Sequence, residues 1–125
     1  MQVLRSHHIS FSVADLDASK RFYGGLLGLA EIPRPAMGLG GVWYRAGETE
    51  VHLIVRPDGI DTGAPPAKLT PVADHAAFQI DDYEAAVAHL RAAGLDVLET
   101  NRNLGQLWVR DPDGHVIELI VPQSR

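Results

Sequence analysis

Three histidines and one glutamate stand at spacings that suggest a shared metal site. His75 follows His8 by 75 − 8 = 67 positions, and Glu118 follows His52 by 118 − 52 = 66 positions. Imidazole nitrogen and carboxylate oxygen are ligands for divalent ions such as zinc, nickel, iron and manganese. The chain has no cysteine, so disulfides, iron–sulfur clusters and thiolate zinc are excluded. These four residues are therefore predicted to hold one divalent metal ion per site.

An internal repeat accounts for the two spacings. The segment HISFSVADLDASKRFYGGLLGL from His8 matches HAAFQIDDYEAAVAHLRAAGLDV from His75. WYRAGETEVHLIV from Trp43 likewise matches WVRDPDGHVIELIV from Trp108, with one extra residue in the second turn. Two diverged copies of a unit of about 55 residues explain nearly the whole chain. We expect one domain over residues 1–125, with module one at about 3–56, a linker rich in Pro and Gly at about 57–73, and module two at about 74–122.

Each copy predicts a strand, then a helix, then further strands. Residues 8–13 alternate between apolar and polar side chains, which is typical of a half-buried strand. Asp15 takes the N-cap position of the first helix, and Asp81 or Asp82 that of the second. Gly28 and Gly94 suit left-handed C-terminal caps. Other strands are expected from His75 and near 41–46, 50–55, 96–100, 105–110 and 115–121, with a turn at 111–114 before the last.

The alternation also predicts the face that each candidate ligand occupies. If the apolar residues of each strand pack on the helix, then His8, His52, His75 and Glu118 lie on the opposite, concave face. An ionised carboxylate within Ile-Glu-Leu-Ile-Val is costly to bury unless it is paired or metal-bound, although on an open sheet it would simply face water. A lone histidine on a strand is more often a surface or packing residue. The matched placement of all four under the repeat is what favours a site.

Other residues are given different roles. His7 falls on the opposite side of its strand from His8, His89 lies in the second helix, and His115 follows a turn. We expect these three histidines to be structural or solvent-exposed. The glycine-rich segment 37–41 is expected to be a turn. Weaker candidates for lining a pocket are Arg45, Arg110, Trp43, Trp108 and Gln79.

Composition narrows the classes of partner. The chain has 125 residues, 46% of them hydrophobic, and a net charge of −5 with no cluster of basic residues. This disfavours binding to nucleic acid through phosphate neutralisation. The N-terminus lacks the apolar core of a signal peptide, and apolar runs of about five residues are too short to span a bilayer. We expect a cytoplasmic protein with a small-molecule substrate and no nucleic-acid or membrane partner.

The motif H-x-x-x-x-V-x-D-L-x-x-S-x-x-F-Y-x-x-x-L-G-L, from His8 to Leu29, resembles the opening module of vicinal oxygen chelate proteins. DHAAFQIDD and VRDPDGHVIELI resemble the start and end of their second module. The resemblance implies an α+β fold of two tandem βαβββ modules, whose curved mixed sheets surround a metal site (the glyoxalase/bleomycin resistance/dihydroxybiphenyl dioxygenase fold). It also implies one ligand near the start and one near the end of each module, the places of His8, His52, His75 and Glu118, and a homodimer in which ligands come from one or two chains.

The resemblance includes several activities. We expect a metal-dependent, glyoxalase-like lyase or isomerase that acts on a small substrate with vicinal oxygens through an enediolate-type intermediate. Glu118, the only carboxylate among the ligands, is the predicted catalytic base. This chain departs from two of the resembled enzymes at one ligand position, because glyoxalase I usually has glutamate at the place of His52 and the epimerases have glutamine. The alternatives are an extradiol-type dioxygenase with iron held by His8, His75 and Glu118, and a non-catalytic protein that binds a small molecule such as an antibiotic.

Overall fold

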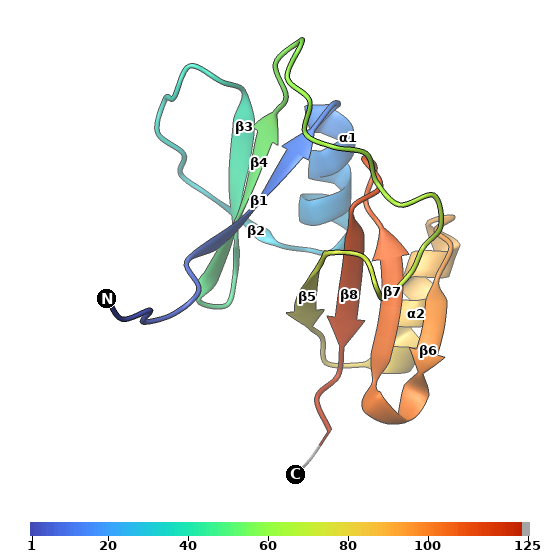
Figure 1. Cartoon of the computed structure of the whole chain (residues 1–125). Coiled ribbons are helices and arrows are strands. Elements are labelled where there is room, and N and C mark those ends of the chain that lie inside the picture. Colours follow the sequence, from blue (N-terminus) through green and yellow to red (C-terminus); the bar gives the residue numbers. More distant parts are fainter. Residues whose placement is uncertain (124–125) are drawn as a thin grey trace. The chain divides into compact units, whose positions relative to one another are not determined.

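Each half of the chain forms one four-stranded mixed sheet with a helix on one face (Figure 1). The computed structural model describes residues 1–123 and divides into two units, Met1–Gly63 and Ala64–Arg125. The boundary between the units falls inside the predicted linker. No helix among the described residues is long and apolar enough to cross a membrane.

The two units have the same order of strands and α-helix, and differ in where a short helical turn lies. The first contains β1 (His8–Val13), α1 (Leu16–Lys20), the π-helical turn η1 (Arg21–Leu26), β2 (Ala30–Ile32), β3 (Gly41–Ala46) and β4 (Thr49–Val55). The second contains β5 (His75–Gln79), α2 (Tyr83–Ala92), β6 (Leu98–Asn101), the 3-10 turn η2 (Arg102–Leu104), β7 (Gln106–Arg110) and β8 (Val116–Ile120). The sheets have the orders β1-β4-β3-β2 and β5-β8-β7-β6, with β1 parallel to β4 and β5 parallel to β8. The predicted pair of βαβββ modules is therefore confirmed.

The helix ends follow the predicted capping chemistry. The Asp15 carboxylate accepts a hydrogen bond from the Ala18 amide at 3.1 Å, and the Asp82 carboxylate accepts one from the Ala85 amide at 3.0 Å. Asp82, not Asp81, is thus the second N-cap. Gly28 and Gly94 have φ angles of 73° and 85°, as left-handed C-terminal positions require.

Three local features differ from the sequence-based expectation. The first helix changes to a wider π turn over Arg21–Leu26, where the Leu27 amide donates to the Phe22 carbonyl at 2.8 Å. Strand β2 was not predicted, because three residues are too few to show an alternating pattern. The expected turn at 37–41 is part of an irregular loop that bends at Gly38 and leads into β3 at Gly41.

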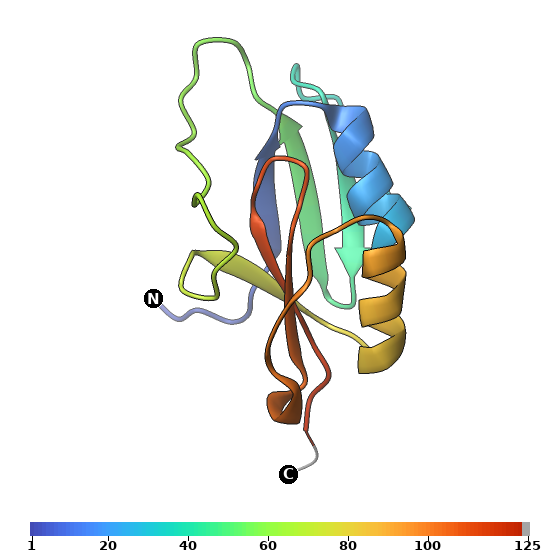
Figure 2. The ribbon, with the colours of Figure 1, turned by 90° about the vertical axis from the view of Figure 1, so that its right-hand side faces the viewer.

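The apolar faces of both sheets pack as predicted. Figure 2 shows α1 lying along one face of the first sheet. Val13, Val51 and Leu53 are fully buried there, and Ile117 and Leu119 occupy the matching face of the second sheet, which α2 covers. The central strands are buried on both faces, since His52 and Glu118 are each only 7% exposed. The alternative in which Glu118 faces water is therefore wrong.

Candidate metal centre

The first unit brings His8 and His52 into direct contact. Strands β1 and β4 are parallel neighbours in which Ser10 pairs with His52. His8 stands two residues before Ser10, so its side chain is on the same face of the sheet as those of Ser10 and His52. The rings of His8 and His52 are stacked, with centroids 4.2 Å apart and an interplanar angle of 15°. Trp43, the partner of His52 on β3, stacks on the same imidazole at 4.0 Å and 5°. Because β4 lies between β1 and β3, the ring of His52 is held between the other two rings.

A carboxylate holds the edge of His52. The Nε2 atom of His52 lies 2.9 Å from Oε1 of Glu50, two residues earlier on β4. The other oxygen of Glu50 lies 3.6 Å from the guanidinium of Arg45. The hydrogen bond from His52, followed by the charge of Arg45, holds the pKa of Glu50 below its ordinary value. Arg45, predicted as a pocket residue, therefore acts on the site through Glu50.

His8 has a second histidine neighbour. Its Nδ1 atom lies 2.8 Å from Nδ1 of His7, and the two rings meet edge to face. The prediction that His7 points away from His8 is wrong, because β1 begins at His8 and strand alternation does not extend to His7. Desolvation by neighbouring groups lowers the pKa of His8, and the adjacent His52 and His7 lower it further. A lowered pKa favours the neutral imidazole, which is the form that binds metal.

The second unit brings His75 and Glu118 together. His75 opens β5, Glu118 lies in the middle of β8, and Nε2 of His75 is 4.0 Å from Oε1 of Glu118. On its other side, the ring places Nδ1 at 2.7 Å from the Ala73 carbonyl oxygen. A carbonyl only accepts hydrogen bonds, so Nδ1 carries the hydrogen and Nε2 of the neutral ring keeps its lone pair. His75 thus presents its free nitrogen on the side of Glu118.

Glu118 has few partners for a buried acid. Its Oε1 accepts a hydrogen bond from Nε2 of Gln106 at 3.3 Å, near the upper limit for such a bond. The indole of Trp108 packs edge to face against His75 at 4.7 Å, and its Nε1 donates to the Thr100 hydroxyl at 2.8 Å. Glu118 is therefore buried beside the imidazole of His75 and the amide of Gln106, and neither a lysine nor an arginine pairs with it among the described residues.

Imidazole nitrogens and a carboxylate oxygen suit a divalent ion. The His75–Glu118 pair and the His8–His52 pair differ in how closely their ligand atoms already match the geometry that one ion requires. Two donors about 2.1 Å from one tetrahedral ion lie about 3.4 Å apart. The 4.0 Å separation of His75 and Glu118 is close to that value. The stacked rings of His8 and His52 have their lone pairs in nearly parallel planes, so one ring must turn before both can bind one ion. Each pair is described within its own unit, and the joint four-residue site stays a prediction.

Sequence reasoning missed two residues at this site, Glu50 and Gln106. Both were detectable from alternation, because Glu50 stands two residues before His52 and Gln106 two residues before Trp108 on the same strand faces. Of the predicted pocket residues, Trp43 and Trp108 contact the histidines. Among the described residues, Gln79, exposed on β5, and Arg110, at the end of β7, make no such contact.

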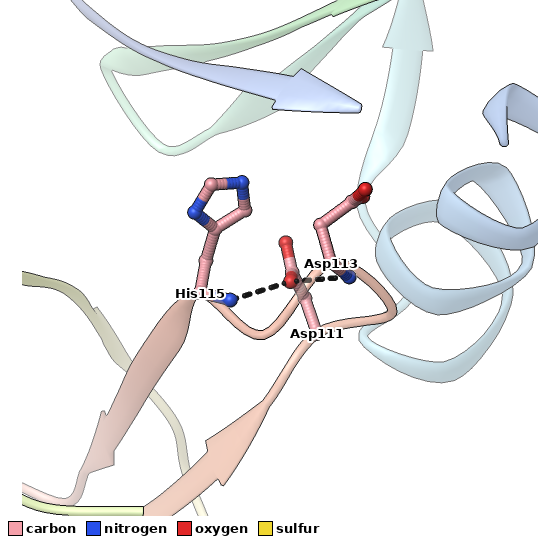
Figure 3. A group of neighbouring side chains, drawn as sticks. All are labelled: Asp111, Asp113 and His115. Carbon is pink, nitrogen blue, oxygen red and sulfur yellow. Dashed lines mark hydrogen bonds between the residues drawn. The ribbon is translucent and has the colours of Figure 1, made fainter. Parts of the chain in front are cut away.

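A separate group of possible ligands lies at the turn between β7 and β8. Asp111, Asp113 and His115 each place one donor atom within 4.8 Å of the others (Figure 3). The buried carboxylate of Asp111 accepts hydrogen bonds from the backbone amides of Asp113, at 3.0 Å, and His115, at 2.8 Å. These bonds from backbone amides close the predicted Asp-Pro-Asp-Gly turn. The expectation that His115 is structural or solvent-exposed, and not a metal ligand, stays a prediction.

Comparison with known proteins agrees with this architecture. The chain is 29% identical over 119 residues to "Glyoxylase I 4" of Arabidopsis thaliana, a match that spans 90% of this chain and 68% of that protein. It is 30% identical over 122 residues to the glutathione transferase FosA of Serratia marcescens, spanning 92% of this chain and 79% of that protein. A solved glyoxalase/dioxygenase structure from Nostoc punctiforme superimposes with a TM-score of 0.78 at 26% identity, covering 99% of both chains.

The family itself follows from the match across both modules. Residues 5–119 match the model of the Glyoxalase/Bleomycin resistance protein/Dioxygenase superfamily, whose members generally use a divalent metal ion and bind small molecules. The names of the relatives describe different reactions, so the activity of this chain has to be argued from its own residues. With its two βαβββ modules and a match that includes both, the chain belongs to the Glyoxalase/Bleomycin resistance protein/Dioxygenase superfamily.

Proposed function

We propose that this chain is a metal-dependent, glyoxalase-like lyase or isomerase acting on a small substrate with two adjacent oxygens. In this proposal His8, His52, His75 and Glu118 hold one divalent ion. The observation that carries the proposal is the buried Glu118 beside His75, with the imidazole oriented by the Ala73 carbonyl so that its free nitrogen is on the carboxylate side. A bound divalent ion would act as a Lewis acid and polarise a substrate carbonyl.

Glu118 has the properties of a proton acceptor next to such a carbonyl. The side chain is 9% exposed, so little water competes for its carboxylate. Its recorded hydrogen bond is the long one from Gln106, which leaves acceptor capacity on both oxygens. A base with spare lone pairs can take a proton from the carbon beside the carbonyl and return it to the neighbouring carbon. This is the proton transfer that an enediolate-type isomerisation requires.

His52 favours a lyase or isomerase over an extradiol-type dioxygenase. A dioxygenase with a facial triad of two histidines and one carboxylate needs open positions for both oxygen and substrate. In this chain a third imidazole lies in contact with His8 and is held on both ring faces. A fourth protein ligand leaves fewer open positions and suits a substrate that binds through its own two oxygens.

Metal analysis is the first test of the proposed function. Protein purified without added metal should contain about one divalent ion per site, and His75→Ala should lose most of it. Gln79→Ala is the matched control, because Gln79 is exposed on the same strand as His75. Iron would favour the dioxygenase alternative, and protein that neither contains nor takes up a divalent ion would favour non-catalytic binding.

Proton exchange tests the chemistry. Small hydroxy-carbonyl compounds incubated in heavy water with the metal-loaded protein should exchange hydrogen at the carbon beside the carbonyl, as followed by NMR. Glu118→Gln should abolish the exchange, because an amide is not a base near neutral pH. A metal-loaded protein that exchanges none of a broad panel of such compounds would contradict the assignment as lyase or isomerase.

The proposal includes a homodimer in which the two pairs of donors come from one chain or from two. The superfamily resemblance supports pairing of modules across chains. The small size of each four-stranded sheet is also consistent with further association. The cytoplasmic location expected from the sequence stays a prediction.

A further inference from the structure

The contact between Glu50 and His52 has a consequence for the ligand atom of His52. Nε2 of His52 lies 2.9 Å from a carboxylate oxygen of Glu50. A carboxylate accepts hydrogen bonds and donates none, so Nε2 must carry the hydrogen. A neutral imidazole has only one N–H, which leaves the lone pair of His52 on Nδ1.

The surroundings of the ring keep it in this orientation. The imidazole is stacked between Trp43 and His8, at 4.0 Å and 4.2 Å between ring centroids. Glu50 is itself anchored, because its second oxygen lies 3.6 Å from the guanidinium of Arg45. Turning the ring by 180° would keep the stacking but place a carbon against the Glu50 oxygen, with loss of the hydrogen bond. The carboxylate is therefore the group that selects between the two ring orientations.

In the second module, a different contact leaves the lone pair of the histidine on the other ring nitrogen. Nδ1 of His75 donates to the Ala73 carbonyl, so its lone pair is on Nε2. The repeat partner of Glu50 is Val116, since Glu50 is aligned with His8 on β4 and Val116 with His75 on β8. A valine cannot orient a histidine by a hydrogen bond. The carboxylate is thus a feature of the first module alone.

We propose that Glu50 is a positioning residue that fixes the Nε2–H tautomer of His52 and makes Nδ1 its metal-binding atom. The metal-binding part of this inference rests on the proposed function, whereas the tautomer is a property of the metal-free protein. Hydrogen-bonded partners of ligating histidines commonly change metal affinity about 10- to 100-fold when removed. Glu50 then acts on the metal through His52, without touching it.

The tautomer is measured directly on the metal-free wild-type protein. Long-range proton–nitrogen correlation spectra of ¹⁵N-histidine-labelled protein, at a pH above about 8 where imidazole is neutral, should show His52 as the Nε2–H form and His75 as the Nδ1–H form. Glu50→Ala should shift His52 toward a mixture of the two forms and leave His75 unchanged. Glu48→Ala is the matched control, because it removes an exposed acid two residues away.

Metal titration of the same variants completes the test. Glu50→Ala should bind the divalent ion about 10- to 100-fold more weakly than wild type, and Glu48→Ala equally well. An Nδ1–H form of His52 in the wild-type spectrum overturns the inference, whatever the metal result. Wild-type metal affinity in Glu50→Ala overturns the positioning role. Failure of the wild-type protein to bind any metal overturns the proposed function instead, and the tautomer measurement still stands by itself.

Discussion

Replacing Glu118 with glutamine separates the cost of a buried carboxylate from its value as a metal ligand. The two side chains have nearly the same shape, and the glutamine oxygen can keep the 3.3 Å hydrogen bond from Gln106. What changes is the charge on a side chain that is 9% exposed. We expect Glu118→Gln to stabilise the metal-free protein and to abolish the response to metal.

The magnitude follows from the contacts of Glu118. Burial of an ionised group costs several kcal/mol, and a hydrogen bond to a charged group returns roughly 1.5–3 kcal/mol. His75 at 4.0 Å contributes little while it is neutral. A net gain of about 1–2 kcal/mol is therefore expected for the metal-free variant, or roughly 3–8 °C in Tm for a chain of this size. At a metal concentration 100 times Kd, the wild-type protein gains about 2.7 kcal/mol, which reverses the order.

Thermal unfolding with a chelator and with excess divalent ion measures both effects. The variant should melt above the wild type in chelator and below it in metal. Glu48→Gln removes an exposed acid and should match the wild type in both conditions. A variant that is less stable than wild type without metal would refute the estimate of burial cost. Equal metal-induced shifts in both proteins would refute Glu118 as a ligand.

Three further predictions concern packing, ligand choice and assembly. Gly24→Ala should destabilise the protein by about 1–3 kcal/mol, because a Cβ there would lie 3.0 Å from the hydroxyl of buried Tyr44. Gly25→Ala is the control, because a Cβ there meets nothing within 4 Å, and it should raise the free energy of unfolding by up to about 1 kcal/mol. If urea unfolding gives Gly24→Ala and Gly25→Ala the same stability, Tyr44 can move aside. His7→Ala and His115→Ala should retain the metal ion, as measured by elemental analysis, because neither residue belongs to the predicted ligand set. Loss of the metal in either variant would show that the replaced histidine is a ligand. If the ion bridges subunits, mass in solution should fall from dimer to monomer when a chelator is added. Lowering the pH below about 6 should have the same effect, because protons then compete with the metal for the ligand imidazoles. A dimer indifferent to metal loss would mean that apolar packing alone holds it, and a monomer with metal bound would exclude bridging.

The sequence alone determined the features that depend on neighbours within a few residues or on the repeat. The faces of β1, β4, β5 and β8 follow from period-two alternation, because successive side chains of a strand point to opposite sides. The first helix start at Asp15 follows from a carboxylate accepting the amide three residues on. The same reasoning narrowed the second start to Asp81 or Asp82, and the structure selected Asp82. The repeat placed His52 and Glu118 at matching positions, and both lie on the central strands of their sheets.

Only the tertiary structure decided which side chains touch. The stacking of His52 on Trp43 depends on the register between β3 and β4, and its bond to Glu50 depends on side-chain rotamers, neither of which a single strand encodes. The same is true of the 2.8 Å contact between His7 and His8, where the strand begins too late for alternation to separate them. Local sequence restricts each side chain to a face, whereas hydrogen bonds between strands set the register that brings those faces together.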